Sequence, residues 1–168
     1  MDSESKAKTA LEFIMPVLEK YNFRWVITGG FASYAYGVPR EITDIDIDID
    51  TSEKSEDFKK FYEELKLARS QELKHFIDQN YDNYNFELTI DGQVVDICPM
   101  AEMNVIDKAS GAYKNFYASG FPDHETVEWH GLQLPLLSKE LIIKNKEMLA
   151  WQRESDFNDI EGLKKLLK

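Results

Sequence analysis

The chain has 168 residues, 43% of them hydrophobic, which is enough for one compact domain with a substantial core. Its formal net charge of −11 repels phosphate backbones and argues against tight non-specific binding of nucleic acid. The one cysteine, Cys98, excludes an internal disulfide bond and a zinc site made of several thiolates. Because the N-terminus lacks a signal-peptide pattern and no long apolar run is present, we expect a soluble, cytoplasmic protein.

The first elements are predicted from the spacing of apolar residues. Residues 6–21 carry them at helical intervals, with Pro16 expected to kink or divide the helix. Residues 24–28 form a short apolar run typical of a strand, and one or two helical turns are expected after it. Gly29 and Gly30 therefore lie where a strand passes into a helix.

Two glycines at such a junction allow a positive φ angle and let a ligand approach the backbone closely. The unpaired N–H groups at the helix start attract anions, so Gly29 and Gly30 are a candidate phosphate site. A plain tight turn explains the pair about as well. Arg40, which follows the turn, is a second candidate for phosphate binding, or it forms an ion pair with Asp44 or Glu41.

The stretch Thr43–Asp50 alternates strictly between apolar and acidic residues, which is typical of a strand with one buried face. The buried face carries Ile45, Ile47 and Ile49, and the opposite face carries Asp44, Asp46, Asp48 and Asp50. Neighbouring carboxylates on one face lie roughly 6 to 7 Å apart and repel each other. A bound divalent cation with oxygen ligands explains this arrangement, and the alternative is a solvated edge strand whose charges prevent aggregation.

The middle of the chain is predicted to hold two helical segments and a hairpin. Residues 52–69 read as an amphipathic helix, and residues 70–79 as a second short helical piece in which His75 is an ordinary surface residue. Asp91-Gly92 is a strong type I′ turn signal within the hairpin 86–97. Counting from this turn places Glu87 opposite Asp96.

Asp96 interrupts an otherwise apolar run, and an acid in that environment typically binds metal or has a perturbed pKa. Residues 99–125 show no clear period and are expected to form loops or short pieces that shape a pocket. A hairpin is expected over 127–134, a helix capped by Ser138 after it, and a last helix over 156–167. No linker or repeat is visible, so we expect one domain over 1–168 with a soft boundary near residue 137.

Three motifs in this order resemble the DNA polymerase beta-type nucleotidyltransferase superfamily in its minimal form. They are Gly29-Gly30 after an apolar strand, Asp44-Ile45-Asp46, and Asp96 on a later strand. The stretches 40–48 and 95–99, together with the closing helices, are especially similar to the lincosamide nucleotidyltransferases. The resemblance covers about residues 25–167. One departure is Cys98, where the lincosamide enzymes tend to carry histidine, and this puts an antibiotic acceptor in doubt.

The resemblance implies an α+β fold with a mixed sheet of about five strands, flanked by helices and followed by C-terminal helices. It also implies a Mg²⁺-dependent enzyme that moves a nucleoside monophosphate from an NTP to a hydroxyl group of a small molecule, an antibiotic being one candidate. Asp44, Asp46 and Asp96 would be the catalytic residues and would hold one or two Mg²⁺ ions. Alternation alone does not exclude Asp46 and Asp48 as the metal pair.

The other implied roles concern the two substrates. Thr28, Gly29, Gly30 and Arg40 would bind the nucleotide, and Lys144 or Lys146 either reaches the phosphates or lies on a solvated helix face. Asp96 would share a metal ion or act as the base on the acceptor, with Glu87 alongside. The alternatives are a toxin–antitoxin nucleotidyltransferase that modifies a protein or RNA, although the acidic surface argues against RNA, and an inactive nucleotide-binding module.

Overall fold

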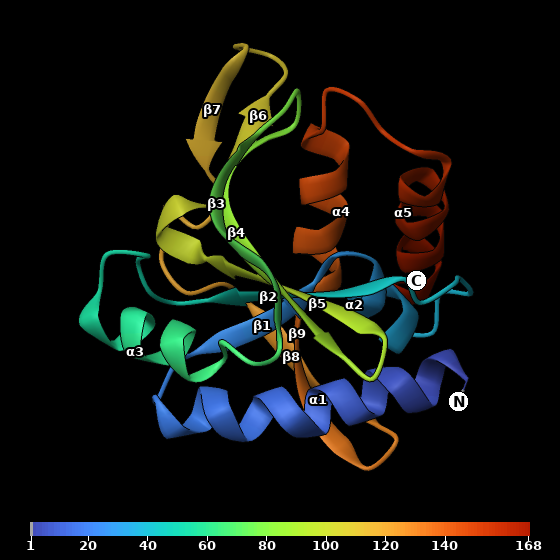
Figure 1. Cartoon of the computed structure of the whole chain (residues 1–168). Helices are drawn as coiled ribbons and strands as arrows, with labels where there is room; N and C mark the ends of the chain where they lie inside the picture. The colour runs from blue at the N-terminus through green and yellow to red at the C-terminus, as the bar shows by residue number, and fades with distance from the viewer. Residues whose placement is uncertain (1) are drawn as a thin grey trace.

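The computed structural model describes residues 2–168 as a mixed β-sheet with helices packed against it (Figure 1). The strands are β1 (Trp25–Thr28), β2 (Asp44–Ile49), β3 (Arg69–Ile77), β4 (Tyr81–Ile90), β5 (Gln93–Pro99), β6 (Asn104–Asp107), β7 (Ala112–Asn115), β8 (His124–Trp129) and β9 (Leu132–Leu137). The helices are α1 (Ser3–Lys20), α2 (Gly29–Ala35), α3 (Glu56–Glu64), α4 (Lys139–Met148) and α5 (Glu154–Leu166), with a 3-10 turn η1 (Met100–Glu102). The expected α+β class is confirmed, but the sheet has nine strands rather than about five.

The order of the strands places β2 in the interior of the sheet. The order is β7-β6-β4-β5-β2-β1-β9-β8, and β3 pairs with β4 outside this path. β2 runs parallel to β5 and antiparallel to β1, and β1 runs parallel to β9. Because both edges of β2 are paired, the solvated edge strand considered for this stretch is excluded.

Apolar side chains from the helices cover the sheet. α1 packs on β4 and β5, and its Leu11, Ile14 and Leu18 are fully buried. Pro16 lies inside α1 and does not end it. Figure 1 shows α4 and α5 next to each other beside α2, and all three helices are in contact. Among residues 2–168, no helix is long and apolar enough to cross a membrane.

The buried face of β2 is the one that the alternation predicts. Ile45, Ile47 and Ile49 have no exposed surface. On β4, which is separated from β2 by β5, Phe86 meets Phe58 and Phe61 of α3 edge-on, with ring centroids 6.0 and 6.2 Å apart. These contacts fix which face of the sheet is apolar, and the acidic residues therefore project from the other face.

Both hairpins turn at the residues that the sequence predicts. In the β4–β5 pair Glu87 lies opposite Asp96, as counted from the Asp91-Gly92 turn. A second hairpin, β8–β9, turns at His130-Gly131 and is longer than predicted at both ends. Ser138 caps α4 by accepting a hydrogen bond from the Leu141 N–H.

Two predictions between the hairpins need correction. Residues 70–79 are not helical, because most of this segment is β3, which pairs with β4 along its length. The helix expected over 52–69 is confined to α3. Within 99–125 the short pieces include β6 and β7, which pair with each other and extend the sheet beyond β4.

Candidate active site

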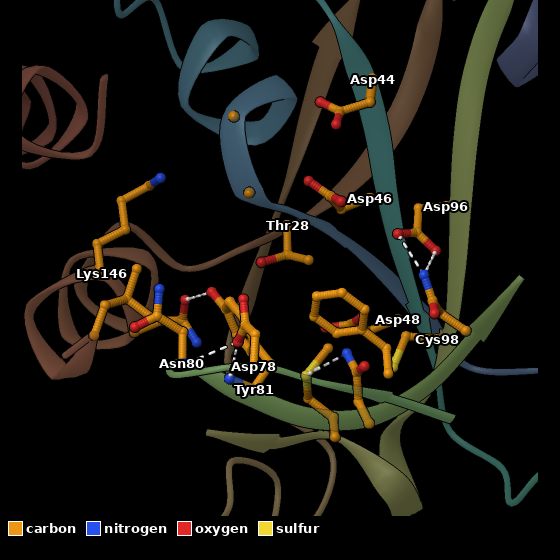
Figure 2. Close-up of a pocket in the computed structure, with 18 of the residues that line it drawn as sticks. Thr28, Asp44, Asp46, Asp48, Asp78, Asn80, Tyr81, Asp96, Cys98 and Lys146 are labelled. Atoms are coloured by element: carbon orange, nitrogen blue, oxygen red, sulfur yellow. Dashed lines mark hydrogen bonds between the residues drawn. The ribbon is translucent and has the colours of Figure 1, made fainter. Parts of the chain in front are cut away.

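Three acidic side chains lie on one face of two adjacent strands. Asp44 and Asp46 belong to β2, and Asp96 belongs to β5, directly beside Asp46 in the parallel register. Residues in register on neighbouring strands point to the same face of a sheet. Figure 2 shows Asp44 and Asp46 projecting into a pocket, with Asp96 next to them. The three carboxylates that the sequence selected are thus brought together.

Asp48, the next acid on this face of β2, is in a different environment. Its side chain is buried, with 2% of the residue exposed, and it accepts a hydrogen bond from the Tyr117 hydroxyl. Asp50, beyond it, pairs with Arg24. The acidic face is therefore divided: Asp48 and Asp50 are tied to Tyr117 and Arg24, whereas Asp44 accepts a hydrogen bond from the adjacent Thr43 hydroxyl, at 2.8 Å, and Asp46 lines the pocket.

The protonation of these acids is strongly perturbed. Burial, followed by the charges of Asp44 and Asp96, raises the pKa of Asp46 well above its usual range. Burial also raises the pKa of Asp96 to about 6, against the hydrogen bond from Asn85, and the charge of Glu87 adds to the increase. Burial raises the pKa of Asp48 to about 7, although the Tyr117 hydrogen bond opposes this change. Burial is thus the largest cause of all three increases, and the charges of neighbouring acids add to it.

Asn85 fixes the orientation of Asp96. Its side-chain Nδ2 donates to both carboxylate oxygens of Asp96, at 2.9 Å each. Asn85 lies on β4 two residues before Glu87, so both side chains lie on the face of the sheet that carries Asp96. Sequence reasoning missed Asn85, although the same count from the hairpin turn that placed Glu87 also places it there.

The two glycines are required for different reasons. Gly29 has a φ of +63°, and a Cβ atom there would lie 2.0 Å from Oδ2 of Asp46. A Cβ atom on Gly30 would lie 2.3 Å from Cζ of Arg40. The groups that approach the backbone of this turn closely are therefore the Asp46 carboxylate and the Arg40 guanidinium of the chain itself. Thr28, just before the turn, pairs with Asp46 in the β1–β2 ladder and lines the pocket.

The cations in the wall of the pocket are Arg40, Lys74, Lys146 and Arg153. The partners of Arg40 and Lys146 were not predicted. Arg40 forms an ion pair with Asp159 of α5, not with the side chain of Asp44 or Glu41. Lys146 of α4 is 4% exposed, and its Nζ lies 2.7 Å from Asp156 Oδ1 and 3.0 Å from Asp159 Oδ2. The solvated helix face expected for either lysine is thus wrong for Lys146, whereas Lys144 is exposed.

The pocket has a volume of about 410 Å³ and extends well beyond the acids. Its remaining wall comes from β4, from the segment after β5, and from α4 with the loop that follows it. The residues that contribute apolar or amide groups there are Tyr81, Asn83, Met103, Phe116, Tyr117, Asn145, Leu149 and Trp151. Segment 99–125 therefore helps to shape the pocket, as expected.

Comparison with solved structures identifies the architecture. A "putative nucleotidyltransferase" from Thermotoga maritima matches with a TM-score of 0.66 and 24% identity over 99% of this chain and 95% of that one. The chain has the nucleotidyltransferase fold. The lincosamide antibiotic adenylyltransferase LnuA, bound to lincomycin, matches with a TM-score of 0.58 and 19% identity over 93% and 95% of the two chains.

A third nucleotidyltransferase structure, ANT(2'')-Ia in complex with adenylyl-2''-tobramycin, matches with a TM-score of 0.58 and 19% identity over 96% and 90% of the two chains. No protein-family model and no curated protein matches this chain. At these identities the likeness establishes the fold. The chemistry of this chain depends on its own residues.

Two features of this chain bear on the binding of a metal ion and of an acceptor. Within residues 2–168, no group of three His, Cys, Asp or Glu side chains is placed to hold a metal ion. Cys98, at the position where histidine was expected from the resemblance, is buried beside Asp48, and burial raises the pKa of its thiol well above the usual range. The thiol therefore stays protonated near neutral pH and cannot replace a histidine as a base.

Proposed function

We propose that this chain is a Mg²⁺-dependent nucleotidyltransferase that moves a nucleoside monophosphate from an NTP to a hydroxyl group of a small molecule. One observation carries the proposal. Asp44, Asp46 and Asp96 lie together on adjacent strands of a nucleotidyltransferase fold, in a pocket that also contains Gly29 and Gly30. No requirement of folding explains three carboxylates facing one pocket.

The donor set fits a hard divalent cation. Asp44, Asp46 and Asp96 supply only oxygen ligands, which Mg²⁺ prefers, and burial, with the charges of neighbouring acids added to it, raises the pKa of Asp46 and Asp96. Gly29 leaves space beside Asp46 that a side chain would fill. When bound, Mg²⁺ would neutralise negative charge on the triphosphate and on the departing pyrophosphate. Asp44, Asp46 and Asp96 are the residues that would hold it, and their carboxylates would have to turn toward a common point, since no three such groups among residues 2–168 are gathered around one in this structure.

The remaining roles belong to groups around the acids. Arg40 and the Gly29-Gly30 backbone would bind the phosphates, and Arg40 supplies a charge-assisted donor next to Gly30. Asp96, with a pKa of about 6, is mostly ionised at neutral pH and can accept the proton of the acceptor hydroxyl. The oxygen of the acceptor hydroxyl forms a bond to the α-phosphorus of the NTP, and the bond between the α-phosphorus and the bridging oxygen of pyrophosphate breaks. Glu87 beside Asp96 is a second proton acceptor.

The size and lining of the pocket support a small acceptor. Beyond the acids, the wall offers aromatic and aliphatic surface from Tyr81, Phe116 and Trp151, and neutral amides from Asn83 and Asn145. Such a mixture of apolar surface and a few polar groups is typical of small-molecule sites. Two of the similar structures contain lincomycin or adenylylated tobramycin, which makes an antibiotic one acceptor to test.

The test is transfer of label from each NTP, in Mg²⁺, to a panel of hydroxyl compounds that includes lincosamides and aminoglycosides. Asp44→Asn and Asp46→Asn should each reduce transfer by more than about a hundredfold, because each removes a carboxylate that would hold the Mg²⁺ ion. Asp107→Asn, which removes a partly exposed acid paired with Lys114, should leave transfer unchanged. Unchanged turnover in both pocket variants would contradict the proposal, and NTP binding without pyrophosphate release would identify an inactive binding module.

A further inference from the structure

Asp159 of α5 contacts two cations of the pocket wall, Arg40 and Lys146, without lining the pocket itself. It has no exposed surface, and its Oδ2 accepts a hydrogen bond from Arg40 Nη1 and forms an ion pair with Lys146 Nζ at 3.0 Å. Arg40 and Lys146 line the pocket. One carboxylate oxygen thus lies behind two positive side chains that reach it from different parts of the chain.

Folding alone gives little reason for a carboxylate in this place. Ionised groups are costly to bury, and buried ion pairs can often be replaced by apolar residues without loss of stability. The other oxygen of Asp159, Oδ1, is buried and has no hydrogen-bond partner among residues 2–168. Apolar residues of the same helix, Ile160 and Leu163, already anchor α5 in the core.

The two cations that Asp159 holds face the acids across the pocket. The guanidinium of Arg40 occupies the space in which a side chain on Gly30 would lie. Figure 2 shows the amine of Lys146 extending toward the start of α2, on the opposite side of that turn from Asp44 and Asp46. A triphosphate that lies along Gly29 and Gly30 would therefore have cations on one side and carboxylates on the other.

We infer that Asp159 is a positioning residue for nucleotide binding: it fixes Arg40 and Lys146 together so that both meet the phosphates of the NTP. The inference rests on the proposed function, because it assigns the residue that orders the phosphate end of the same site. Asp156 does not share this role. It contacts Lys146 but not Arg40, and its Oδ2 accepts a hydrogen bond from the Arg153 N–H at the start of α5.

The phosphate end can be tested without knowing the acceptor. Binding of each NTP and of inorganic triphosphate would be measured by calorimetry in Mg²⁺, with the full chain and its variants. Asp159→Asn and Arg40→Gln should each weaken both ligands by about tenfold or more, as expected for loss of a charge-assisted hydrogen bond. A nucleoside without phosphates should bind equally to all variants.

A double variant separates positioning from a merely structural role. If Asp159 acts through Arg40, the Asp159→Asn/Arg40→Gln protein should bind triphosphate more tightly than the product of the two single effects predicts. Lys144→Gln, an exposed lysine on α4, and Asp107→Asn serve as controls with unchanged binding. Circular dichroism checks folding, and Asp159→Glu, which keeps the charge but shifts the carboxylate, should show the same weakening if the Asn variant does not fold.

The possible failures are distinguishable. A wild-type protein that binds neither NTP nor triphosphate in Mg²⁺ contradicts the proposed function. If the wild-type protein binds both ligands, two results overturn the role of Asp159 and leave the proposed function intact. Either Asp159→Asn does not change binding, or the effects of Asp159→Asn and Arg40→Gln on binding simply multiply in the double variant.

Discussion

At the scale of single residues, Gly29 is the position where the backbone conformation and the acidic site meet. Its φ of +63° lies in the left-handed region, where a side chain costs about 1 to 2 kcal/mol. Its missing Cβ also leaves room for Oδ2 of Asp46. Gly111 has a similar φ of +70° but no atom within 4 Å of the Cβ position, so it isolates the backbone cost.

Gly29→Ala and Gly111→Ala should therefore lose similar stability, by about 1 to 2 kcal/mol in urea denaturation. Only Gly29→Ala should also lose Mg²⁺-dependent NTP binding, because the new methyl group must displace the Asp46 carboxylate. Calorimetry of both variants checks this expectation. Equal NTP affinity in the two proteins would mean that the position of Asp46 does not matter to nucleotide binding.

How far single residues could be predicted depended on whether a local pattern marks them. Alternation within one strand places Asp44 and Asp46 on the acidic face, the resemblance selects them from the acids there, and Asp96 stands out as an acid in an apolar run. Arg40 and Asp159 are separated by 119 positions, and the sequence contains no repeating pattern that connects a loop before β2 with the last helix. Long-range partners of this kind are set by tertiary packing, which is why the burial of Lys146 was also missed.

At the scale of elements, the same distinction separates the hairpins from β3. The β4–β5 register followed from two turn residues, because a type I′ turn allows only one pairing. β3 has glutamate, leucine and lysine, which favour helix, and most of its residues are exposed, so no apolar alternation marks it. Its pairing with β4 overrides these local preferences.

The packing of α4 on α5 depends on a buried acid, and its pH dependence has a definite sign. Burial alone would raise the pKa of Asp156, but hydrogen bonds from Lys146 and from the Arg153 N–H lower it below the usual value. A group whose pKa is lower in the folded chain stabilises the fold above its unfolded pKa, and this stabilisation is lost as the pH falls through the folded value. The contribution of Asp156 should therefore be complete at neutral pH and decline below about pH 4.

Asp156→Asn should cost about 3 kcal/mol in the free energy of unfolding at neutral pH, because it leaves Lys146 buried with one partner fewer. The difference from wild type should shrink in acid, since the wild-type carboxyl group then becomes protonated. Urea denaturation at a neutral and an acid pH measures both values. A difference that stays constant across this range would show that the charge of Asp156 does not stabilise the helix pair.

At the scale of the whole molecule, the pocket lies between the sheet and the two C-terminal helices, near the soft boundary expected at residue 137. Hydrogen bonds of Asn80 and Tyr81, together called the clamp, join the sheet to α4 and the loop after it. Asn80, in the turn between β3 and β4, donates to the Trp151 carbonyl at 2.8 Å and accepts from the Trp151 N–H at 3.0 Å. Tyr81 adds a hydrogen bond to Asn145 of α4. The loop after α4 is thus held by a turn of the sheet more than by its own contacts, since Trp151 is 56% exposed.

Asn80→Ala should release this loop without unfolding the sheet. We expect a stability loss of about 1 to 3 kcal/mol, because the Trp151 N–H and carbonyl lose their partner, together with faster hydrogen exchange over residues 149–153. Asn115→Ala is a matched control, because Asn115 also bonds backbone groups, the carbonyls of Met100 and Ala101, which belong neither to α4 and α5 nor to the loop between them. It should lose similar stability and leave exchange over 149–153 unchanged. If Asn80→Ala instead accelerates exchange throughout β2 and β5, the clamp supports the whole fold and the pocket rim has no separate motion.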